Sequence, residues 1–144
     1  MAEARVCTEL PLPADEAWKL LSDLSRFDQW LTIHDEWCSD IPELALGVHV
    51  KEQIVVMGMK SVVDWTLDAY DPPTAFTISG AGMAGAQISF TLAVAGDGAG
   101  DGSTVTVATE FTGAMIVGPI SAAVEKNATA ELEASLVKLR ELAV

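Results

Sequence analysis

The strongest candidate for chemistry in this sequence is His34, in the stretch WLTIHDEW that runs from Trp30 to Trp37. A histidine can act as a general acid or base near neutral pH. No serine, cysteine or carboxylate constellation accompanies it, and the alternation of Asp35 and Glu36 does not place a defined acid on its face. Two interpretations stay open: a satisfied structural residue, or a group that contacts a ligand or acts in catalysis.

A glycine-rich run, GAGMAG at positions 80–85, matches the letters of a dinucleotide-binding fingerprint. That fingerprint needs a helix N-terminus after it, where the pyrophosphate is bound. The residues that follow, QISFTLAV, alternate with the period of a strand. We therefore interpret the run as a hairpin connection and expect no nucleotide cofactor.

Metal and redox sites have little support. Asp97 and Asp101 lie in the loop GDGAGDG, which lacks the ligand spacing and the terminal glutamate of an EF-hand. Cys7 and Cys38 form neither a CxxC motif nor a Cys/His cluster. We expect reduced thiols that serve as buried small apolar side chains, although whether the two lie close together stays open. His49 is interpreted as a strand-surface residue.

The element that must position these residues is the last stretch, 118–142, which has the period of an amphipathic helix. Pro119 is tolerated in a first helical turn. Small residues such as Ala123 and Ala130 make the helix a wall that leaves room above a sheet. Its apolar stripe is predicted to contain Ile120, Val124, Ala128, Leu132, Leu136 and Leu139.

Before this helix the sequence reads mostly as strands. Alternation predicts strands at 3–10, 48–57, 62–70, 74–79, 87–95 and 103–112, and residues 32–41 are a strand or a loop running into one. A helix opens at 14–16, and a second at 26–31 is predicted to be capped by Ser25. A hairpin turn is predicted at 58–60. Glu110 is expected to face solvent.

The inner faces of two predicted strands, 62–70 and 48–57, are expected to contribute to the site. The inner face of 62–70 is predicted to carry Val63, Trp65, Leu67 and Ala69, with Tyr70 on the other side. The inner face of 48–57 cannot be chosen from the sequence. The resulting class is α+β, with helices on one face of an antiparallel sheet. One helix with one apolar stripe cannot fill a strongly twisted sheet, so the interior holds a wide core or a pocket.

Composition excludes several functions. The chain has 144 residues, 50 % of them hydrophobic, and a formal net charge of −13 from 21 acidic and 8 basic residues. A phosphate backbone would be repelled, so no nucleic-acid partner is expected. No stretch reaches the 18 apolar residues of a membrane span, and the N-terminus has no signal-peptide core. We expect a cytoplasmic protein without stable membrane insertion.

Three stretches resemble a known family: PADEAWKLLSDLSRFDQWLTIHDEW, VVDWTLDAYDPP and GPISAAVEKNATAELEASLVKLREL. They look like the START/Bet v 1-like (SRPBCC) superfamily, in its bacterial polyketide cyclase/dehydrase and lipid-transport branch. The order of predicted elements is similar over the whole chain. The stretch WLTIH with the following Trp37 looks most like an actinobacterial subgroup, one member of which is described as the toxin of a toxin–antitoxin pair.

The resemblance implies a single helix-grip domain over residues 1–144. In that fold a curved antiparallel sheet of about seven strands wraps on the long C-terminal helix. Its element order is one strand, two short helices, six strands and the helix. The resemblance also implies a cavity between sheet and helix that holds an apolar or amphipathic small molecule. From the motifs, we expect no cofactor and no metal.

The side chains expected to contact a ligand are aromatic, aliphatic or methionine, together with one polar side chain on the last helix. Met57 and Met59 are expected to join two further methionines at the pocket rim. His34 is the one catalytic candidate. The expected ligand-binding residues are Trp30, His34, Trp37, Trp65, Met83, Phe111, Met115, Val124 and Asn127.

Three functions stay open. The first is binding of a hydrophobic or lipid-like molecule. The second is a cyclase or dehydratase-type enzyme that uses His34; the sequence has no nucleophile–base–orienter set, and Arg5, Arg26 and Arg140 are predicted to lie outside the pocket. The third is a toxin that acts through a ligand or a small antitoxin-like protein partner.

Overall fold

The computed structural model describes residues 2–82, 85–96, 101–114 and 116–143. Its strands are β1 (Ala2–Leu10), β2 (His34–Trp37), β3 (His49–Val56), β4 (Met59–Asp71), β5 (Ala75–Ala81), β6 (Gln87–Gly96) and β7 (Ser103–Thr112). Its helices are α1 (Ala14–Ser22), the 3₁₀ turn η1 (Leu24–Arg26), α2 (Phe27–Trp30) and α3 (Gly118–Leu142). The predicted element order is confirmed.

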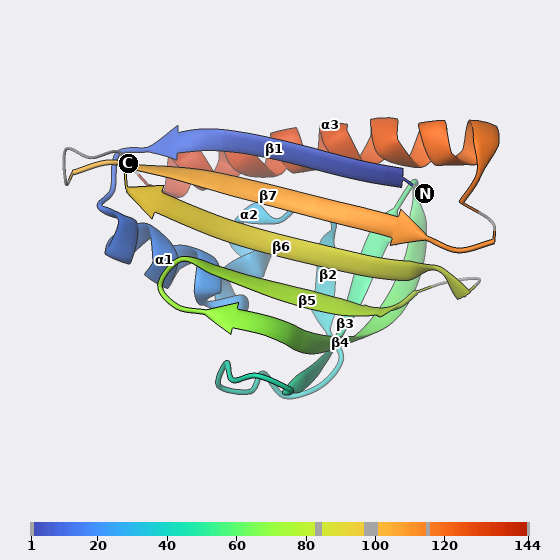
Figure 1. The fold of residues 1–144 in the computed structure, drawn as a ribbon, viewed down its shortest axis with the longest axis horizontal. Helices are drawn as coiled ribbons and strands as arrows, with labels where there is room; N and C mark the ends of the chain where they lie inside the picture. Colours follow the sequence, from blue (N-terminus) through green and yellow to red (C-terminus); the bar gives the residue numbers. More distant parts are fainter. Residues whose placement is uncertain (1, 83–84, 97–100, 115, 144) are drawn as a thin grey trace.

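The seven strands form one antiparallel sheet in the order β1-β7-β6-β5-β4-β3-β2. The sheet curls so strongly that β3 and β4 turn away from β1, and α3 runs alongside β1 across the full width of the molecule (Figure 1). Helices α1 and α2 lie at the end of the sheet where α3 finishes. This is the α+β helix-grip fold predicted from the sequence.

Alternating side chains place the core on the concave face of the sheet. In β6, the residues Ile88, Phe90, Leu92 and Val94 are all buried, while their neighbours are half-buried or exposed. Successive side chains of a strand point to opposite faces, so a period of two buries one whole set. The same alternation buries Val105, Val107 and Phe111 in β7.

Strand β4 departs from its predicted pattern near its end. Val63, Trp65 and Leu67 are buried, but Ala69 is exposed. The pairing of β4 with β5 shifts register between Leu67 and Ala69, which marks a β-bulge. A bulge inserts one residue and exchanges the two faces beyond it. The prediction that Ala69 faces inward, with Tyr70 opposite, was therefore wrong: Tyr70 is half-buried.

The β3–β4 turn lies one residue earlier than predicted. Val56 pairs with Met59, so the connection consists of Met57 and Gly58 alone rather than residues 58–60. Both have positive φ angles, 53° and 78°. That combination is typical of a type I′ hairpin turn, whose twist matches the flanking strands.

The cap of the second helical segment also differs from the prediction. Ser25 donates its backbone N–H to Oδ1 of Asp23 at 3.1 Å, so Asp23 is the capping residue. The reason is that the chain begins to coil earlier than predicted, in η1. Phe27, Trp30 and Leu31 form the inner side of this segment and are buried.

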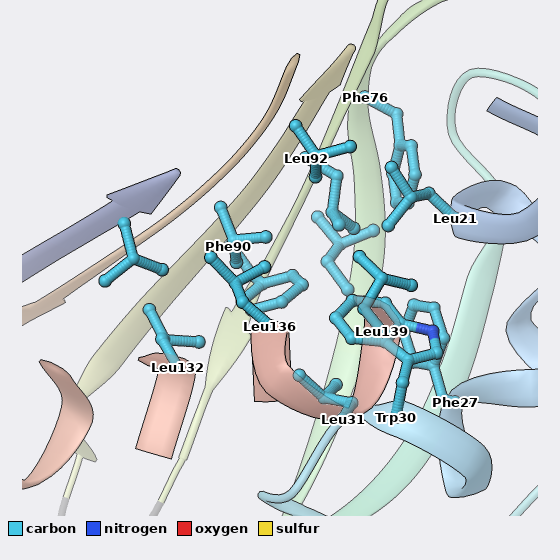
Figure 2. Close-up of a cluster of buried hydrophobic side chains, with 14 of the residues drawn as sticks. Leu21, Phe27, Trp30, Leu31, Phe76, Phe90, Leu92, Leu132, Leu136 and Leu139 are labelled. Atoms are coloured by element: carbon cyan, nitrogen blue, oxygen red, sulfur yellow. The ribbon is translucent and has the colours of Figure 1, made fainter. Parts of the chain in front are cut away.

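Helix α3 has the predicted bounds, and its stripe divides into two parts. Leu132, Leu136 and Leu139 are buried, and they pack against Phe90 and Leu92 of β6 and the short helices (Figure 2). Val124 and Ala128 are also buried, but Ile120 is 47 % exposed. The expectation that Ile120 belongs to the core stripe was wrong, because the first turns of α3 extend beyond the packed core.

The two cysteines are a further correction. Cys7 and Cys38 are free and exposed rather than buried. Cys7 lies on the outer face of β1, where alternation leads its side chain away from the core. Helices that meet the length and hydropathy of a membrane span are absent from the described part of the chain.

Candidate functional site

An apolar cleft of about 270 Å³ lies between the first turns of α3 and the ends of four strands. It is positioned by the β3–β4 hairpin, the start of β6, the end of β7 and the chain leading into α3. Its lining is aliphatic, aromatic or thioether, with a single hydroxyl from Ser61. The lining residues are Ile54, Val56, Met57, Met59, Ser61, Ala86, Ile88, Phe111, Ile116, Ile120 and Val124.

The cleft exists because the interior is filled unevenly. At the end of α3 where Leu139 lies, Phe27 and Trp30 occupy the space under the helix (Figure 2), and both are fully buried. Near the start of α3, the inward side chains are the smaller Val124 and Ala128. The helix therefore stands over a filled core at one end and over a hollow at the other.

The rim of the cleft is unusually apolar for a protein surface. Met57, Met59 and Ile120 line the cleft and are about half exposed, at 46 %, 54 % and 47 %. Methionine side chains adapt their shape to varied apolar surfaces. Exposed apolar side chains gathered in one place, rather than scattered singly, mark a surface that binds something.

The residues expected from the sequence to meet a ligand fall into separate places. Phe111 and Val124 line the cleft, as do Met57 and Met59 at its rim. Asn127 lies one turn deeper along α3. Met83 and Met115 lie outside the described residues.

The tryptophans expected at the pocket do not line this cleft. Trp30 is fully buried in the core. Trp37 donates its indole N–H to the carbonyl of Leu24 at 3.0 Å, which ties β2 to the short helices. Trp65 points inward as predicted, but its indole N–H is used by the carboxylate of Glu52, at 2.8 Å.

His34 also has a partner that the sequence did not reveal. Its Nδ1 contacts Oε2 of the same Glu52, and the two side chains are only 3 % and 2 % exposed. Glu52 thus accepts from Trp65 with one oxygen and pairs with His34 through the other. The three side chains form a buried polar cluster that joins β2, β3 and β4.

The sequence did not identify Glu52 as a buried residue, because the inner face of its strand could not be chosen from the sequence. Along β3 the buried residues are Val50, Glu52 and Ile54, and their neighbours are exposed or half-buried. In the sequence this is an apolar alternation interrupted by one acid. Such an interruption is the signal of a buried carboxylate, which needs hydrogen-bond partners in the interior.

A histidine oriented by a carboxylate is a pattern that catalysis often uses. Here, however, the ring of His34 is enclosed, with the ring of Trp37 at 4.9 Å and that of Phe27 at 6.4 Å between centroids. His34 does not line the apolar cleft. The described residues also contain no group of three or more histidine, cysteine, aspartate or glutamate side chains that could hold a metal ion.

A second, much smaller pocket of about 10 Å³ lies deeper under α3. Val56 and Phe111 line both the cleft and this inner pocket. Asn127 contributes to its wall, and Oδ1 of Asn127 accepts the backbone N–H of Met57 at 3.3 Å. Helix α3 is therefore tied to the β3–β4 turn beside the inner pocket.

The chain is similar to known proteins over its whole length. The family profile described as polyketide cyclase/dehydrase and lipid transport matches residues 1–144. Toxin Rv0910 of Mycobacterium tuberculosis is 36 % identical over 137 residues, which are 94 % of both chains. A second protein of that organism, the uncharacterized protein Rv1546, is 30 % identical over 99 % of both chains.

Solved structures with low sequence identity share the fold. A START superfamily protein from Mycobacterium smegmatis superposes with a TM-score of 0.75 at 14 % identity, covering 99 % of this chain and 97 % of its own. A protein from Thermus thermophilus gives a TM-score of 0.76 at 18 % identity, covering 96 % and 94 %.

Proposed function

This chain belongs to the polyketide cyclase/dehydrase and lipid transport family, and we propose that it binds a small apolar molecule in the cleft under the first turns of α3. The observation that carries the proposal is the lining of that cleft, in which every side chain but Ser61 is a hydrocarbon or a thioether. Burial of apolar surface contributes about 25 cal/mol per Å², so such a lining favours an apolar ligand.

The size of the cleft limits the ligand. Pockets for small molecules are typically about 300–1,000 Å³, and this one is about 270 Å³. It suits a small apolar molecule, or one end of a longer one whose remainder lies on the apolar rim. Met57, Met59 and Ile120 supply that rim.

The proposal is tested by native mass spectrometry of freshly purified protein and by titration with the neutral fluorophore N-phenyl-1-naphthylamine. We expect a co-purified small molecule or saturable binding of the fluorophore. Val124→Trp, which fills the cleft, should weaken binding at least about tenfold. Val137→Trp is the matched control, because Val137 is 44 % exposed on the same helix and does not line the cleft. Absence of both a bound molecule and saturable binding would refute the proposal.

A cyclase or dehydratase-type reaction is supported less well. Its acid–base candidate, His34, is 3 % exposed and pairs with Glu52, and it does not line the cleft. A general base must come within hydrogen-bond reach of the proton that it removes. A binding role therefore accounts for the geometry with fewer assumptions than a catalytic one.

The relatives favour a second candidate function, growth inhibition. The observation is the 36 % identity over 94 % of both chains with a protein named as a toxin. Induced expression in a mycobacterial host tests it, with growth followed in the presence of wild type and of Val124→Trp. Inhibition by the wild type alone would join the toxin role to the cleft. Inhibition by both would favour a surface that binds a protein partner, and unchanged growth with both would exclude this candidate.

A further inference from the structure

The walls of the cleft come from parts of the sequence that carry no charge. Three stretches, 53–59, 72–96 and 111–124, contain no aspartate, glutamate, lysine, arginine or histidine. They supply every residue that lines the cleft except Ser61. The start of α3, the end of β7 and the adjoining ends of β5 and β6 lie together at one end of the molecule (Figure 1). The net charge of −13 is therefore carried by residues outside these stretches.

Four exposed apolar side chains lie at the mouth of the cleft. Met57, Met59 and Ile120 line it and are 46 %, 54 % and 47 % exposed. Val117 is 58 % exposed and is the residue directly before α3, next to the cleft residue Ile116. We call Met57, Met59, Val117 and Ile120 the apolar patch. Contact with a partner that removes this patch from water is favourable.

A lipid surface is a poor partner for the apolar patch. Proteins that lie on membranes combine tryptophan, phenylalanine or leucine with lysine and arginine, which attract anionic lipids. The patch contains none of these residues, and the chain as a whole is strongly acidic. A membrane with anionic lipids would repel it.

The absence of charge favours a second copy of this chain over a different protein. Different proteins select one another largely through complementary charges, and the apolar patch has none to offer. In a two-fold symmetric interface the same patch of both copies meets itself. Such an interface needs no complementary charges, but it needs like charges to be absent from its centre. The apolar patch meets that condition.

We propose that the apolar patch is the interface of a two-fold symmetric dimer, in which a second copy of this chain covers the mouth of the cleft. The interface has few apolar side chains, so it is smaller than the standard of about 1,600 Å². We therefore expect a weak dimer, with a dissociation constant of about 1–100 μM.

Sedimentation velocity of the full chain, from about 1 μM to about 500 μM, measures this equilibrium. We expect the mass to rise from that of a monomer to that of a dimer across the series. Higher salt should tighten the dimer severalfold, because each copy carries a net charge of −13 and salt screens the repulsion between them.

Val117→Asp places a carboxylate in the patch of both copies. Val117 is the N-cap of α3 and makes no side-chain capping bond, and aspartate is a favoured N-cap residue, so the helix should be kept. The variant should dimerise at least about tenfold more weakly. Val137→Asp is the matched control, because Val137 is 44 % exposed on the same helix and does not line the cleft; it should dimerise as the wild type does.

A readout at low concentration separates the interface from the cleft. Val117 does not line the cleft, so Val117→Asp at about 1 μM should bind N-phenyl-1-naphthylamine as the wild type does. A monomeric wild type throughout the series would overturn the dimer. Equal dimerisation of wild type and Val117→Asp, or a dimer that salt weakens, would overturn the patch as its interface. Flotation of the wild type, but not of Val117→Asp, with neutral phosphatidylcholine vesicles would assign the patch to a lipid surface and overturn the second copy as its partner.

Discussion

Replacement of Glu52 by leucine should destabilise the protein more than any surface charge change. Glu52 is 1 % exposed and is the acceptor for two buried groups, Nε1 of Trp65 and Nδ1 of His34. In Glu52→Leu both groups remain buried without an acceptor. Each orphaned group costs about 1–3 kcal/mol, so the expected loss is about 2–6 kcal/mol. The range agrees with the roughly 3–5 kcal/mol that breaking a buried ion pair costs.

Urea and thermal unfolding followed by circular dichroism measure this loss. For a chain of this length, 1 kcal/mol corresponds to about 2–4 °C in Tm, so a loss of about 2–6 kcal/mol is about 4–24 °C. Glu16→Gln is the control, because Glu16 pairs with Lys19 at 3.6 Å on the exposed side of α1. An exposed pair contributes about 0–1 kcal/mol, and the control should stay within that range.

A double variant separates the pair from the general cost of substitution. Glu52→Leu combined with His34→Leu leaves only the Trp65 N–H without its acceptor, so the expected loss returns to about 1–3 kcal/mol plus packing changes. The double variant should therefore be less destabilised than the sum of the two single variants. Simple additivity, or a Glu52→Leu loss below about 1 kcal/mol, would refute the view that the cluster is a closed hydrogen-bonded unit.

Three further predictions concern packing and exposure. Leu136→Ala should lower the free energy of unfolding by about 2–5 kcal/mol in urea, because Leu136 is a buried residue of α3. Val137→Ala, at the neighbouring exposed position, should change it by no more than about 0.5 kcal/mol. Equal effects of the two variants would contradict the orientation of α3. Gly80→Ala should lower the free energy of unfolding by about 1–3 kcal/mol, since an added Cβ would stand 2.5 Å from the carbonyl oxygen of Asp64. An unchanged urea midpoint would show that β4 moves aside at that position without loss of stability. Cys7 and Cys38 should both react with Ellman's reagent in the native protein, because both thiols are free and exposed; one unreactive thiol would contradict that exposure.

Much of the fold follows from two periods in the sequence. The alternation of apolar residues in β6 and β7 and the apolar stripe of α3 indicate which side chains are buried. Side-chain direction repeats every two residues in a strand and every 3.6 residues in a helix. Two of the errors occur where a local event interrupts the period. The bulge between Leu67 and Ala69 exchanged the faces of β4, and a two-residue turn displaced the predicted hairpin. The bulge and the turn leave no mark in the alternation of residue types along their strands, so periodicity alone does not reveal them.

The site was harder to predict than the fold, for a different reason. Phe111 and Val124 were expected at the pocket and do line the cleft. Trp30 and His34 were expected among the ligand-binding residues, yet neither lines the cleft: Trp30 is fully buried in the core, and His34 pairs with Glu52. Which part of a concave sheet stays hollow depends on the volumes of side chains from several elements. The sequence does not specify that arrangement until the elements are placed together.

The division of α3 into two halves has a consequence for how the cleft admits a ligand. The C-terminal half is held by Leu132, Leu136 and Leu139 in the core, and Ser135 accepts the backbone N–H of Thr32 at 2.9 Å. The N-terminal half stands over the cleft and is tied to the β3–β4 turn through the 3.3 Å contact between Asn127 and Met57. Local opening follows regions with few buried apolar contacts. The β3–β4 hairpin and the first turns of α3 should therefore open locally more readily than the end of the fold that contains Glu52 and His34.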